Sequence, residues 1–429
     1  MSHITVSRLP SPGYPGRAAL VAMLALLAVL LSPIGAGAAP PTSPLTTDPA
    51  DAAAGWLTGE FVDGDHLAAE IDLDGNGIID PATEVFPDYG LTADAILAFA
   101  AAGSAGDAAG AATDYLATNV LAYTGDGAAE SYAGSLAKLI LVADIMGRDP
   151  TDFGGEDLVT RLLAQEAEDG RFSDVSAFGD FSNPIGQSLA IIGLERATAA
   201  GAPTTSVDFL VGVQCADGGF VSDLSTLPCA TGEVDTTAFA VQALEMVGRN
   251  AAADAATTYL IGQQASDGSF ATPGFGNPPV TTANSNSTGL AAQALRVAGK
   301  EDAADAAVTW LLDRQVGADG PQEQQGAFAF ESTGFDPANA ARATTQAIAG
   351  VSGIGLGDLV APTDPLAYGL DVGDGGVLPP PPGAGPPPPP AELPATGEAP
   401  GGLLEVGIAL LVVGGAATVL ARRRTHGSA

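Results

Sequence analysis

Apolar and polar residues in the middle of the chain follow a pattern that recurs about every fifty residues. Four stretches with the apolar spacing of a helix run into an Asp-Gly pair, at residues 169–170, 217–218, 267–268 and 319–320. A loop and a second apolar stretch follow each pair, at residues 187–194, 237–247, 288–297 and 344–349. Gly supplies the positive φ that ends a helix, and Asp accepts hydrogen bonds from backbone donors in the turn. Each unit is therefore predicted to be a helical hairpin.

Two weaker copies of the unit precede these four. One pairs residues 52–57 with 92–102, and the other pairs residues 113–121 with 135–146. The sequence thus predicts an all-α domain of six hairpins over residues 50–370. A hairpin of this length has an apolar face that it cannot bury alone, so the units either stack as an open solenoid or close into a ring.

The repeated segments carry a family resemblance. Gln214 to Phe220 and Gln264 to Phe270 each place an Asp-Gly pair shortly before the final Phe, which resembles the glutamine-tryptophan repeat of squalene cyclases and the related prenyltransferase repeats. Phe stands where the family usually has Trp. The resemblance covers roughly residues 50–355. It implies a terpenoid cyclase-like α6/α6 toroid of six helical hairpins, with inner and outer helices.

The same resemblance implies one candidate catalytic acid. Squalene cyclases protonate their substrate with the middle aspartate of an Asp-x-Asp-Asp-Thr-Ala motif, and residues 233–238 here read Glu-Val-Asp-Thr-Thr-Ala. Asp235 keeps the position of the acid, whereas Glu233 and Thr236 replace its neighbours. Flanking carboxylates and their hydrogen-bond partners tune such a protonated, activated carboxyl, and here one of them, at Thr236, is lost. The alternative is that Asp235 or Thr236 only caps the helix over residues 237–247.

The residues on which other enzymes of the resembling families depend are absent from this sequence. We find no Asp, Cys and His set for the zinc of protein prenyltransferases, and no Asp-Asp-x-x-Asp cluster for diphosphate. A ring could still bind a ligand at its central mouth. The residues predicted to line it, by their position before or within each inner helix, are Tyr89, Asp94, Tyr132, Gln187, Asp235, Asn286 and Arg342.

Both ends of the chain look like export signals. Arg8 and Arg17 precede an apolar run over residues 18–31 and a stretch of small residues, so residues 1–38 are predicted to be a signal peptide and 39–49 a short linker. Residues 371–392 are rich in Pro and Gly and are predicted to form an extended stalk.

The last segment, residues 393–429, resembles the cell-wall sorting signals of sortase substrates. It contains Leu393-Pro394-Ala395-Thr396-Gly397, a predicted transmembrane segment over residues 402–421, and Arg422-Arg423-Arg424. The resemblance implies that a sortase releases Gly397 onward and joins Thr396 covalently to peptidoglycan. We therefore expect a secreted protein that is anchored to the cell wall, with sortase and peptidoglycan as partners.

Charge, cysteines and one acidic loop add three expectations. Fifty acidic residues oppose fifteen basic ones, and a formal net charge of −35 repels phosphate backbones, so nucleic acid is excluded as a partner. Cys215 and Cys229, the two cysteines, are predicted to form a disulfide in an oxidising exterior. A calcium loop is the third expectation, since oxygen ligands alternate as in an EF-hand up to position 9. Its predicted ligands are Asp72, Asp74, Asn76, Ile78, Asp80 and Glu84.

The alternatives to these readings are a solvated acidic turn for the calcium loop and a redox pair for the cysteines. For the function, our first prediction is a wall-displayed, non-catalytic module whose toroid binds a small molecule or a partner protein. The second is a terpenoid-cyclase-like enzyme that uses Asp235 as its acid. A purely structural or adhesive surface module is the third.

Overall fold

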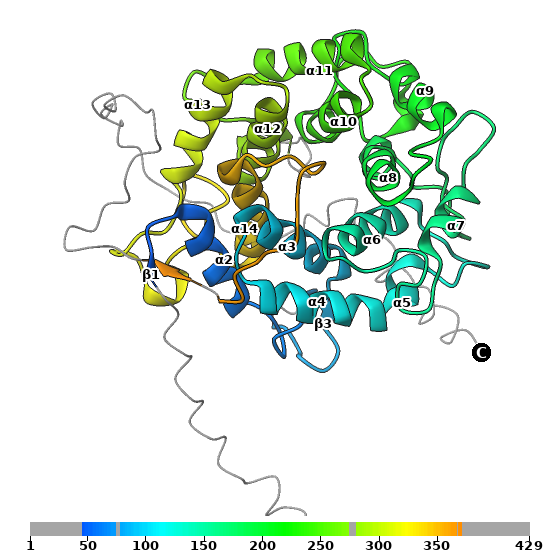
Figure 1. The fold of residues 1–429 in the computed structure, drawn as a ribbon. Coiled ribbons are helices and arrows are strands. Elements are labelled where there is room, and N and C mark those ends of the chain that lie inside the picture. The colour runs from blue at the N-terminus through cyan, green and yellow to red at the C-terminus, as the bar shows by residue number, and fades with distance from the viewer. Residues whose placement is uncertain (1–44, 74–77, 274–279, 367, 371–429) are drawn as a thin grey trace, which may run out of the picture. The chain divides into compact units, whose positions relative to one another are not determined.

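Helices make up most of the described chain (Figure 1). The computed structural model describes residues 45–73, 78–273, 280–366 and 368–370, which belong to one compact unit that begins at residue 44. The thirteen α-helices of these residues are α2 (Pro49–Gly59), α3 (Tyr89–Ala102), α4 (Gly106–Thr118), α5 (Val120–Thr124), α6 (Ala133–Ile145), α7 (Leu158–Leu163), α8 (Pro184–Ala197), α9 (Thr204–Gly212), α10 (Val234–Met246), α11 (Asn250–Gln263), α12 (Ser285–Val297), α13 (Glu301–Leu312) and α14 (Pro337–Ser352). The all-α prediction is confirmed to that extent.

Six helices contact one another in cyclic order. The contacts run from α3 through α6, α8, α10, α12 and α14 and return to α3, and Figure 1 views the resulting ring along its axis. These inner helices are apolar on nearly every side, and ten of the thirteen residues of α6 are buried. A helix of that kind needs packing partners all round. The hydrophobic core therefore lies between the inner helices and the layer outside them.

The outer helices bury one face each. α4 packs on α3, α7 on α6, α9 on α8, α11 on α10 and α13 on α12, while α2 contacts both α14 and α3. In α4 the buried residues are Ala109, Ala112, Thr113 and Leu116, whose spacing marks a single face. The helix predicted over residues 113–121 is interrupted, because α4 ends at Thr118 and α5 begins after Asn119.

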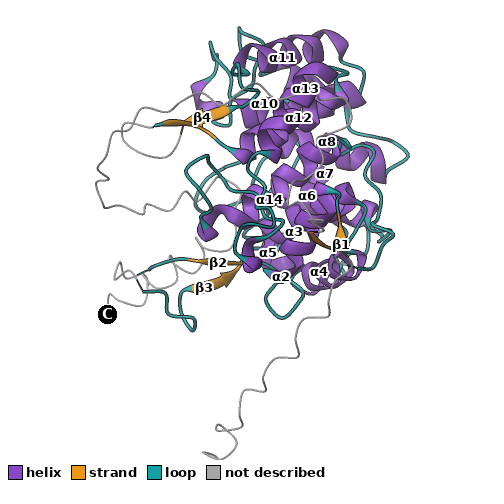
Figure 2. Ribbon diagram, turned by 90° about the vertical axis from the view of Figure 1, so that its left-hand side faces the viewer, coloured by secondary structure: helices purple, strands orange, loops and turns teal. Residues whose placement is uncertain are grey.

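The inner helices run parallel. Gln242 and Gln293, each the ninth residue of its helix, hydrogen-bond to each other across α10 and α12 at 3.0 Å. We call the end at which the inner helices begin the mouth; it is marked by Tyr89, Ala133, Pro184, Val234, Ser285 and Pro337. Two hairpins precede inner helices there, β2 (Ala68–Glu70) with β3 (Val85–Pro87) and β4 (Ala271–Pro273) with β5 (Thr281–Ala283). Figure 2 shows both projecting from the same side of the helices.

The glutamine of the repeated motif joins consecutive units. The Gln264 side-chain amide donates to the carbonyl of Gly268 in its own turn and to the carbonyl of Ala303 in α13. Gln214 does the same with Gly218 and with Ala252 in α11. Each glutamine therefore holds its turn against the first residues of the next outer helix.

The glycine and phenylalanine of the motif complete this junction. Gly268 has φ of +92°, and a Cβ there would lie 2.2 Å from the carbonyl oxygen of Ala306. Phe270 is fully buried, and its backbone N–H donates to the Thr288 hydroxyl at the start of α12. The motif thus specifies close backbone contact between units, which a side chain at the glycine would prevent.

In the fourth unit the predicted Asp319-Gly320 turn is present, with the Gly320 N–H donating to Gly317, but it is not the turn that the motif glutamine holds. Gln315 donates to Gly326 rather than to Gly320, and Gly326 has the positive φ, +94°, of the other motif glycines. The reason is an insertion that contains a short 3₁₀-helix, Gln322–Gln324. Gln315 also donates to the carbonyl of Pro49 in α2. The last outer helix is therefore joined to the first one.

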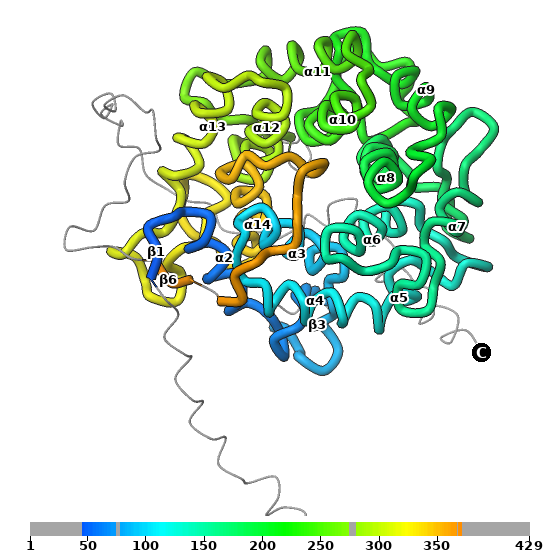
Figure 3. The backbone as a smooth tube through the Cα atoms, in the orientation of Figure 1, coloured from blue at the N-terminus to red at the C-terminus, as the bar shows by residue number. Residues whose placement is uncertain are grey.

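After α14 the chain crosses the other end of the ring, opposite the mouth. We call residues 353–362 the strap; Figure 3 shows the tube passing over the inner helices there. The chain then reaches β6 (Gly369–Leu370), which pairs in parallel with β1 (Leu45–Thr46). None of the described helices is long and apolar enough to span a membrane. The predicted signal peptide, stalk, sortase motif and transmembrane segment 402–421 lie outside the described residues and remain predictions.

Candidate functional site

A cavity lies at the centre of the ring. It encloses about 470 Å³ including its opening, and all six inner helices contribute to its wall. Its larger apolar residues are Leu97, Leu189, Phe239, Leu290, Leu356 and Leu359. Its polar residues are Asp94, Lys138, Gln293, Thr345 and Gln346. The 470 Å³ includes solvent outside the wall, so the lining and not the size suggests a ligand site: a largely apolar wall with a few polar groups is typical of small-molecule sites.

One part of the wall carries a buried ion pair. Lys138 of α6 is 2 % exposed, and its ammonium lies 2.6 Å from the Asp94 carboxylate of α3. Burial, the largest single effect, disfavours the charged lysine, but the Asp94 charge, the nearby Tyr123 and the hydrogen bond to Asp94 together outweigh it and raise the pKa of Lys138. Arg342 of α14 extends the cluster, lying 3.9 Å from Asp94 and 3.4 Å from Asp88. The predicted residues Asp94 and Arg342 are thus brought together, in a cluster that is neutral overall.

Asp235 lies across the ring from this cluster, since α10 and α3 are opposite members of the six. It is the second residue of α10, one turn before the cavity residue Phe239 and on the same side of the helix. Its Oδ1 atom is buried and accepts no hydrogen bond among the described residues. Burial raises the pKa of Asp235 to about 6, with a contribution from the Glu233 charge and against a hydrogen bond from Ser287. The carboxyl is therefore partly protonated near neutral pH.

The neighbours of Asp235 are held in place. The Glu233 carboxylate accepts hydrogen bonds from the Ser222 backbone N–H at 2.9 Å and from the Thr236 hydroxyl at 3.2 Å. Ser287, on α12, contacts Thr272 of β4 at 3.2 Å. The predicted residue Asn286 precedes Ser287, and its Oδ1 is likewise buried without a partner among the described residues. Two buried, unpaired oxygens thus occur in the first turns of neighbouring inner helices.

The capping role considered for Asp235 is wrong. α10 begins at Val234 with Glu233 as N-cap residue, and no side chain makes the capping hydrogen bond. Asp235 and Thr236 both lie inside the first turn. Asp235 therefore gives α10 no capping hydrogen bond.

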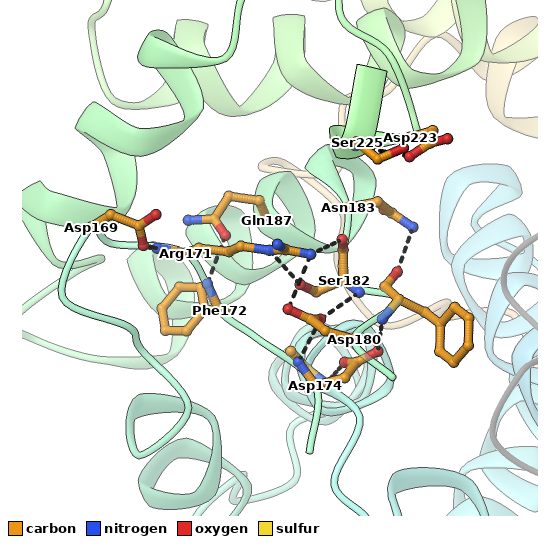
Figure 4. Close-up of polar contacts among 12 residues, drawn as sticks. Asp169, Arg171, Phe172, Asp174, Asp180, Ser182, Asn183, Gln187, Asp223 and Ser225 are labelled. Atoms are coloured by element: carbon orange, nitrogen blue, oxygen red, sulfur yellow. Dashed lines mark hydrogen bonds and ion pairs between the residues drawn. The ribbon is translucent and has the colours of Figure 1, made fainter. Parts of the chain in front are cut away.

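Gln187 serves the fold rather than the cavity. Its side-chain oxygen accepts the Phe172 N–H at 3.0 Å (Figure 4). Its nitrogen donates to the carbonyls of Gly170 and Ser206. Both polar atoms of the side chain are therefore used by the backbone of the repeat junction. Gln187 stands at the fourth position of α8, where α10 and α12 have Thr237 and Thr288 in the same role.

Tyr89 and Tyr132 also lie outside the cavity lining, to which only Asp94 of the seven predicted residues belongs. Tyr89 is half-buried in an aromatic cluster, with its ring 6.1 Å from that of Tyr115 and 6.0 Å from that of Tyr123. Tyr132 is the N-cap residue of α6 and is 6 % exposed. Sequence reasoning missed Lys138, although a lone charge inside the apolar run at residues 136–143 was a usable sign of it. The strap residues Leu356 and Leu359 carried no such sign.

Figure 4 also shows how the loop before α8 is fixed at the mouth. Asp180 accepts hydrogen bonds from the N–H groups of Asp174 and Ser182, and it pairs with Arg171 at 3.1 Å. Asp174 accepts from Ala133 at the start of α6. Burial raises the pKa of Asp174 to about 6. Because every partner in these contacts belongs to the protein itself, we assign Asp174 and Asp180 to stabilising the loop.

The metal and disulfide predictions concern the same mouth region. Asp74 and Asn76 lie outside the described residues, so the calcium loop stays a prediction; no cluster of three His, Cys, Asp or Glu occurs within the described ranges. The Glu84 carboxylate accepts from the backbone N–H groups of Leu73 and Asp80. Cys215 and Cys229 form a disulfide, with Cα atoms 4.8 Å apart.

Comparison with known proteins identifies structural neighbours. The sequence matches no family model, and it finds no curated relative. A protein from Actinoplanes is similar with a TM-score of 0.50 and 16% identity, over 71% of this chain and 98% of that one. The type II terpene cyclase MstE from Scytonema gives 0.51 and 13%, over 71% and 96%. A variant of MstE in complex with geranylgeranyl dihydroxybenzoate as substrate gives 0.52 and 12%, over 72% and 96%.

These neighbours correct the first functional prediction. We expected a wall-displayed binding module without catalysis, but structural neighbours of the chain are terpene cyclase enzymes, and nothing in the comparisons indicates a cell-wall surface protein. The enzyme alternative of the sequence analysis fits better. At such low identity the likeness establishes the fold and not the activity. The described chain has a helical fold of the terpene cyclase-like kind.

Proposed function

We propose that the described helices form an α6/α6 toroid of six hairpins. Each hairpin is an outer helix followed along the chain by an inner one: α2 and α3, α4 and α6, α7 and α8, α9 and α10, α11 and α12, and α13 and α14. Three observations support it. The inner helices contact one another in a closed cycle, each outer helix lies against an inner one, and Gln315 links the last outer helix to the first. A closed cycle buries the apolar face of every unit, which an open array leaves exposed at both ends.

We infer that the protein is a terpenoid-cyclase-like enzyme in which Asp235 is the proton donor. The observation that carries this inference is the buried Oδ1 of Asp235, unpaired among the described residues, one helical turn from a largely apolar cavity. A buried polar atom without a partner costs stability, so its persistence at a cavity indicates use. The raised pKa keeps part of the population protonated, as an acid catalyst requires.

The chemistry follows from these groups. The protonated Asp235 carboxyl transfers its proton to one carbon of a substrate alkene, and the other alkene carbon becomes cationic. Further alkenes of the same chain attack the cation and close rings, and loss of a proton ends the sequence, so the product is an isomer of the substrate. Apolar walls such as Phe239 and Leu290 exclude water that would trap the cation. Thr236 cannot act as the second acid of the family motif; its hydroxyl donates to Glu233 instead.

The test compares the full-length protein with Asp235→Asn and Glu245→Gln. Glu245 is the control because it lies near the far end of the same helix and outside the cavity lining. Each protein is incubated with acyclic polyprenes and with geranylgeranyl dihydroxybenzoate in D₂O. We expect the unmodified protein and Glu245→Gln to form cyclic isomers that carry one solvent deuteron, and Asp235→Asn to lose at least a hundredfold in rate. Absence of cyclic product from the unmodified protein, or full activity in Asp235→Asn, contradicts the proposal.

A further inference from the structure

The strap closes the end of the cavity opposite the mouth. It begins at Gly353, where α14 ends, and crosses the inner ring. The chain that follows it reaches the turn between α3 and α4, where the N–H groups of Ala105 and Gly106 donate to the carbonyls of Leu366 and Asp364. In Figure 3 this crossing is the orange tube over the inner helices. No other repeat unit contributes such a segment among the described residues.

Side chains of three inner helices hold the strap by its backbone. Arg196 of α8 donates to the carbonyls of Leu356, Gly357 and Leu359, and its guanidinium also pairs with Asp144 at 2.8 Å. Gln242 of α10 accepts the Leu356 N–H at 2.9 Å, and Gln293 of α12 donates to the Ile354 carbonyl at 2.7 Å. Polar groups of the ring therefore fix the position of the strap backbone.

The strap side chains are left to face the cavity. Leu356 and Leu359 are 4 % and 1 % exposed, and both line the cavity together with Phe239 and Leu290. Because the strap backbone is fixed at several points, these two side chains form a rigid floor. Loss of a rigidly held leucine leaves a cavity that its surroundings fill only in part.

The floor and the proposed acid lie at opposite ends of the site. Asp235 is the second residue of α10 and Gln242, which holds the strap, is the ninth. Seven residues correspond to about 10 Å along a helix axis. When the alkene of a substrate lies beside Asp235, the rest of that substrate can therefore extend only a limited distance into the cavity before it meets the floor.

We propose that Leu356 and Leu359 set the length of the linear isoprenoid chain that the cavity accepts, because the far end of the chain stops against them. The proposal rests on the proposed function for the class of ligand. It predicts that shortening the floor side chains admits a chain longer by one five-carbon unit, and that enlarging one of them excludes the longest chain that the unmodified protein binds.

The test measures binding of prenyl alcohols of ten, fifteen and twenty carbons by titration calorimetry, in full-length Asp235→Asn so that no turnover interferes. In that background, Leu356→Ala/Leu359→Ala should move the optimum to the next longer alcohol, with a change of at least tenfold in the ratio of the two dissociation constants. Leu356→Phe should move it to a shorter one. Leu244→Ala, at a fully buried leucine of α10 that does not line the cavity, controls for general destabilisation and should leave the optimum in place.

The results also separate the two proposals. An unchanged length dependence in both folded floor variants, or no binding of any alcohol, overturns the floor proposal. A shifted optimum together with full activity in Asp235→Asn leaves the floor in place and removes the proposed acid. Thermal unfolding of each variant shows whether a lost affinity reflects an unfolded protein.

Discussion

At the scale of single residues, one carboxyl group in the cavity wall, Asp94, and one a helical turn beyond it, Asp235, lie in contrasting surroundings. Asp94 lies 2.6 Å from the Lys138 ammonium and shares it as an ion pair. No cation of the described residues contributes to the pKa of Asp235, which burial raises to about 6. Carboxyls whose surroundings differ in this way serve different purposes, one as a fixed charge and one as an acid. Lys138 and Arg342 thus keep the Asp94 side of the cavity charged while the Asp235 side can be neutral.

The raised pKa of Asp235 predicts a pH-dependent gain in stability for Asp235→Asn. The folded state favours the protonated carboxyl, so its stabilising effect is complete below the ordinary pKa of 3.8 and is lost as the pH rises through about 6. Asparagine cannot ionise. We expect the melting temperature of Asp235→Asn to match that of the unmodified protein at pH 4 and to exceed it by about 2–5 °C at pH 7.

Differential scanning calorimetry at pH 4, 5, 6 and 7 measures this difference. Glu245→Gln is again the control and should show no comparable trend. A constant difference between Asp235→Asn and the unmodified protein across the range would mean that the carboxyl does not titrate as described. Asp174, whose pKa is also raised to about 6, is present in both proteins and cancels in the comparison.

At this scale the sequence was informative about part of the site. The family motif located Asp235, and helix position located Asp94 and Arg342. The sequence could not show which of these side chains the repeat junctions use, since Gln187 and Asn286 both lie in the first turns of inner helices. Only the neighbouring backbone decides between them: Gln187 faces the Phe172 N–H, whereas the Asn286 oxygen lacks a donor among the described residues.

At the scale of elements, the repeated motif is a device for close packing. Its glycine both adopts a positive φ and leaves room for a neighbouring backbone carbonyl. Gly268→Ala should therefore lower stability strongly. The substitution combines a strained φ of +92° with a contact of 2.2 Å to the Ala306 carbonyl, and we expect it to lower the free energy of unfolding by about 3 kcal/mol.

Gly262→Ala is the matched control. Gly262 lies in α11, six residues before Gly268, and a Cβ there meets nothing within 4 Å. Alanine favours the helix, so this variant should be more stable by about 0.5–1 kcal/mol. Urea unfolding followed by circular dichroism measures both. Equal effects of the two substitutions would show that the motif glycine is not a packing residue.

The elements themselves were largely predictable, because the apolar spacing and the Asp-Gly turns are local. The fourth turn was not, since Gly320 and Gly326 both follow Gln315 and only the contact with α2 selects Gly326. The strap was missed for a related reason. Its leucines have no periodic neighbours, and what fixes them is Arg196, about 160 residues earlier in the chain.

At the scale of the whole described fold, Gln315, which follows α13, contacts α2 and makes this closing junction equivalent to the interior ones. Gln315 donates to Pro49 and Gly326 as Gln264 donates to Ala303 and Gly268. Gln315→Ala should therefore cost at least as much stability as Gln264→Ala, about 1–3 kcal/mol for two lost hydrogen bonds. Urea unfolding checks this, and a negligible loss in Gln315→Ala alone would indicate an open array rather than a ring.

The parallel pairing of β1 with β6 brings residues 45–46 beside residues 369–370. The first and the last residues that the structure describes are therefore adjacent. A short linker could connect them, and new termini could be cut in a loop between any two repeats, which makes the fold a candidate for circular permutation. A force applied between these two points would load one two-residue strand pair before it reached any helix.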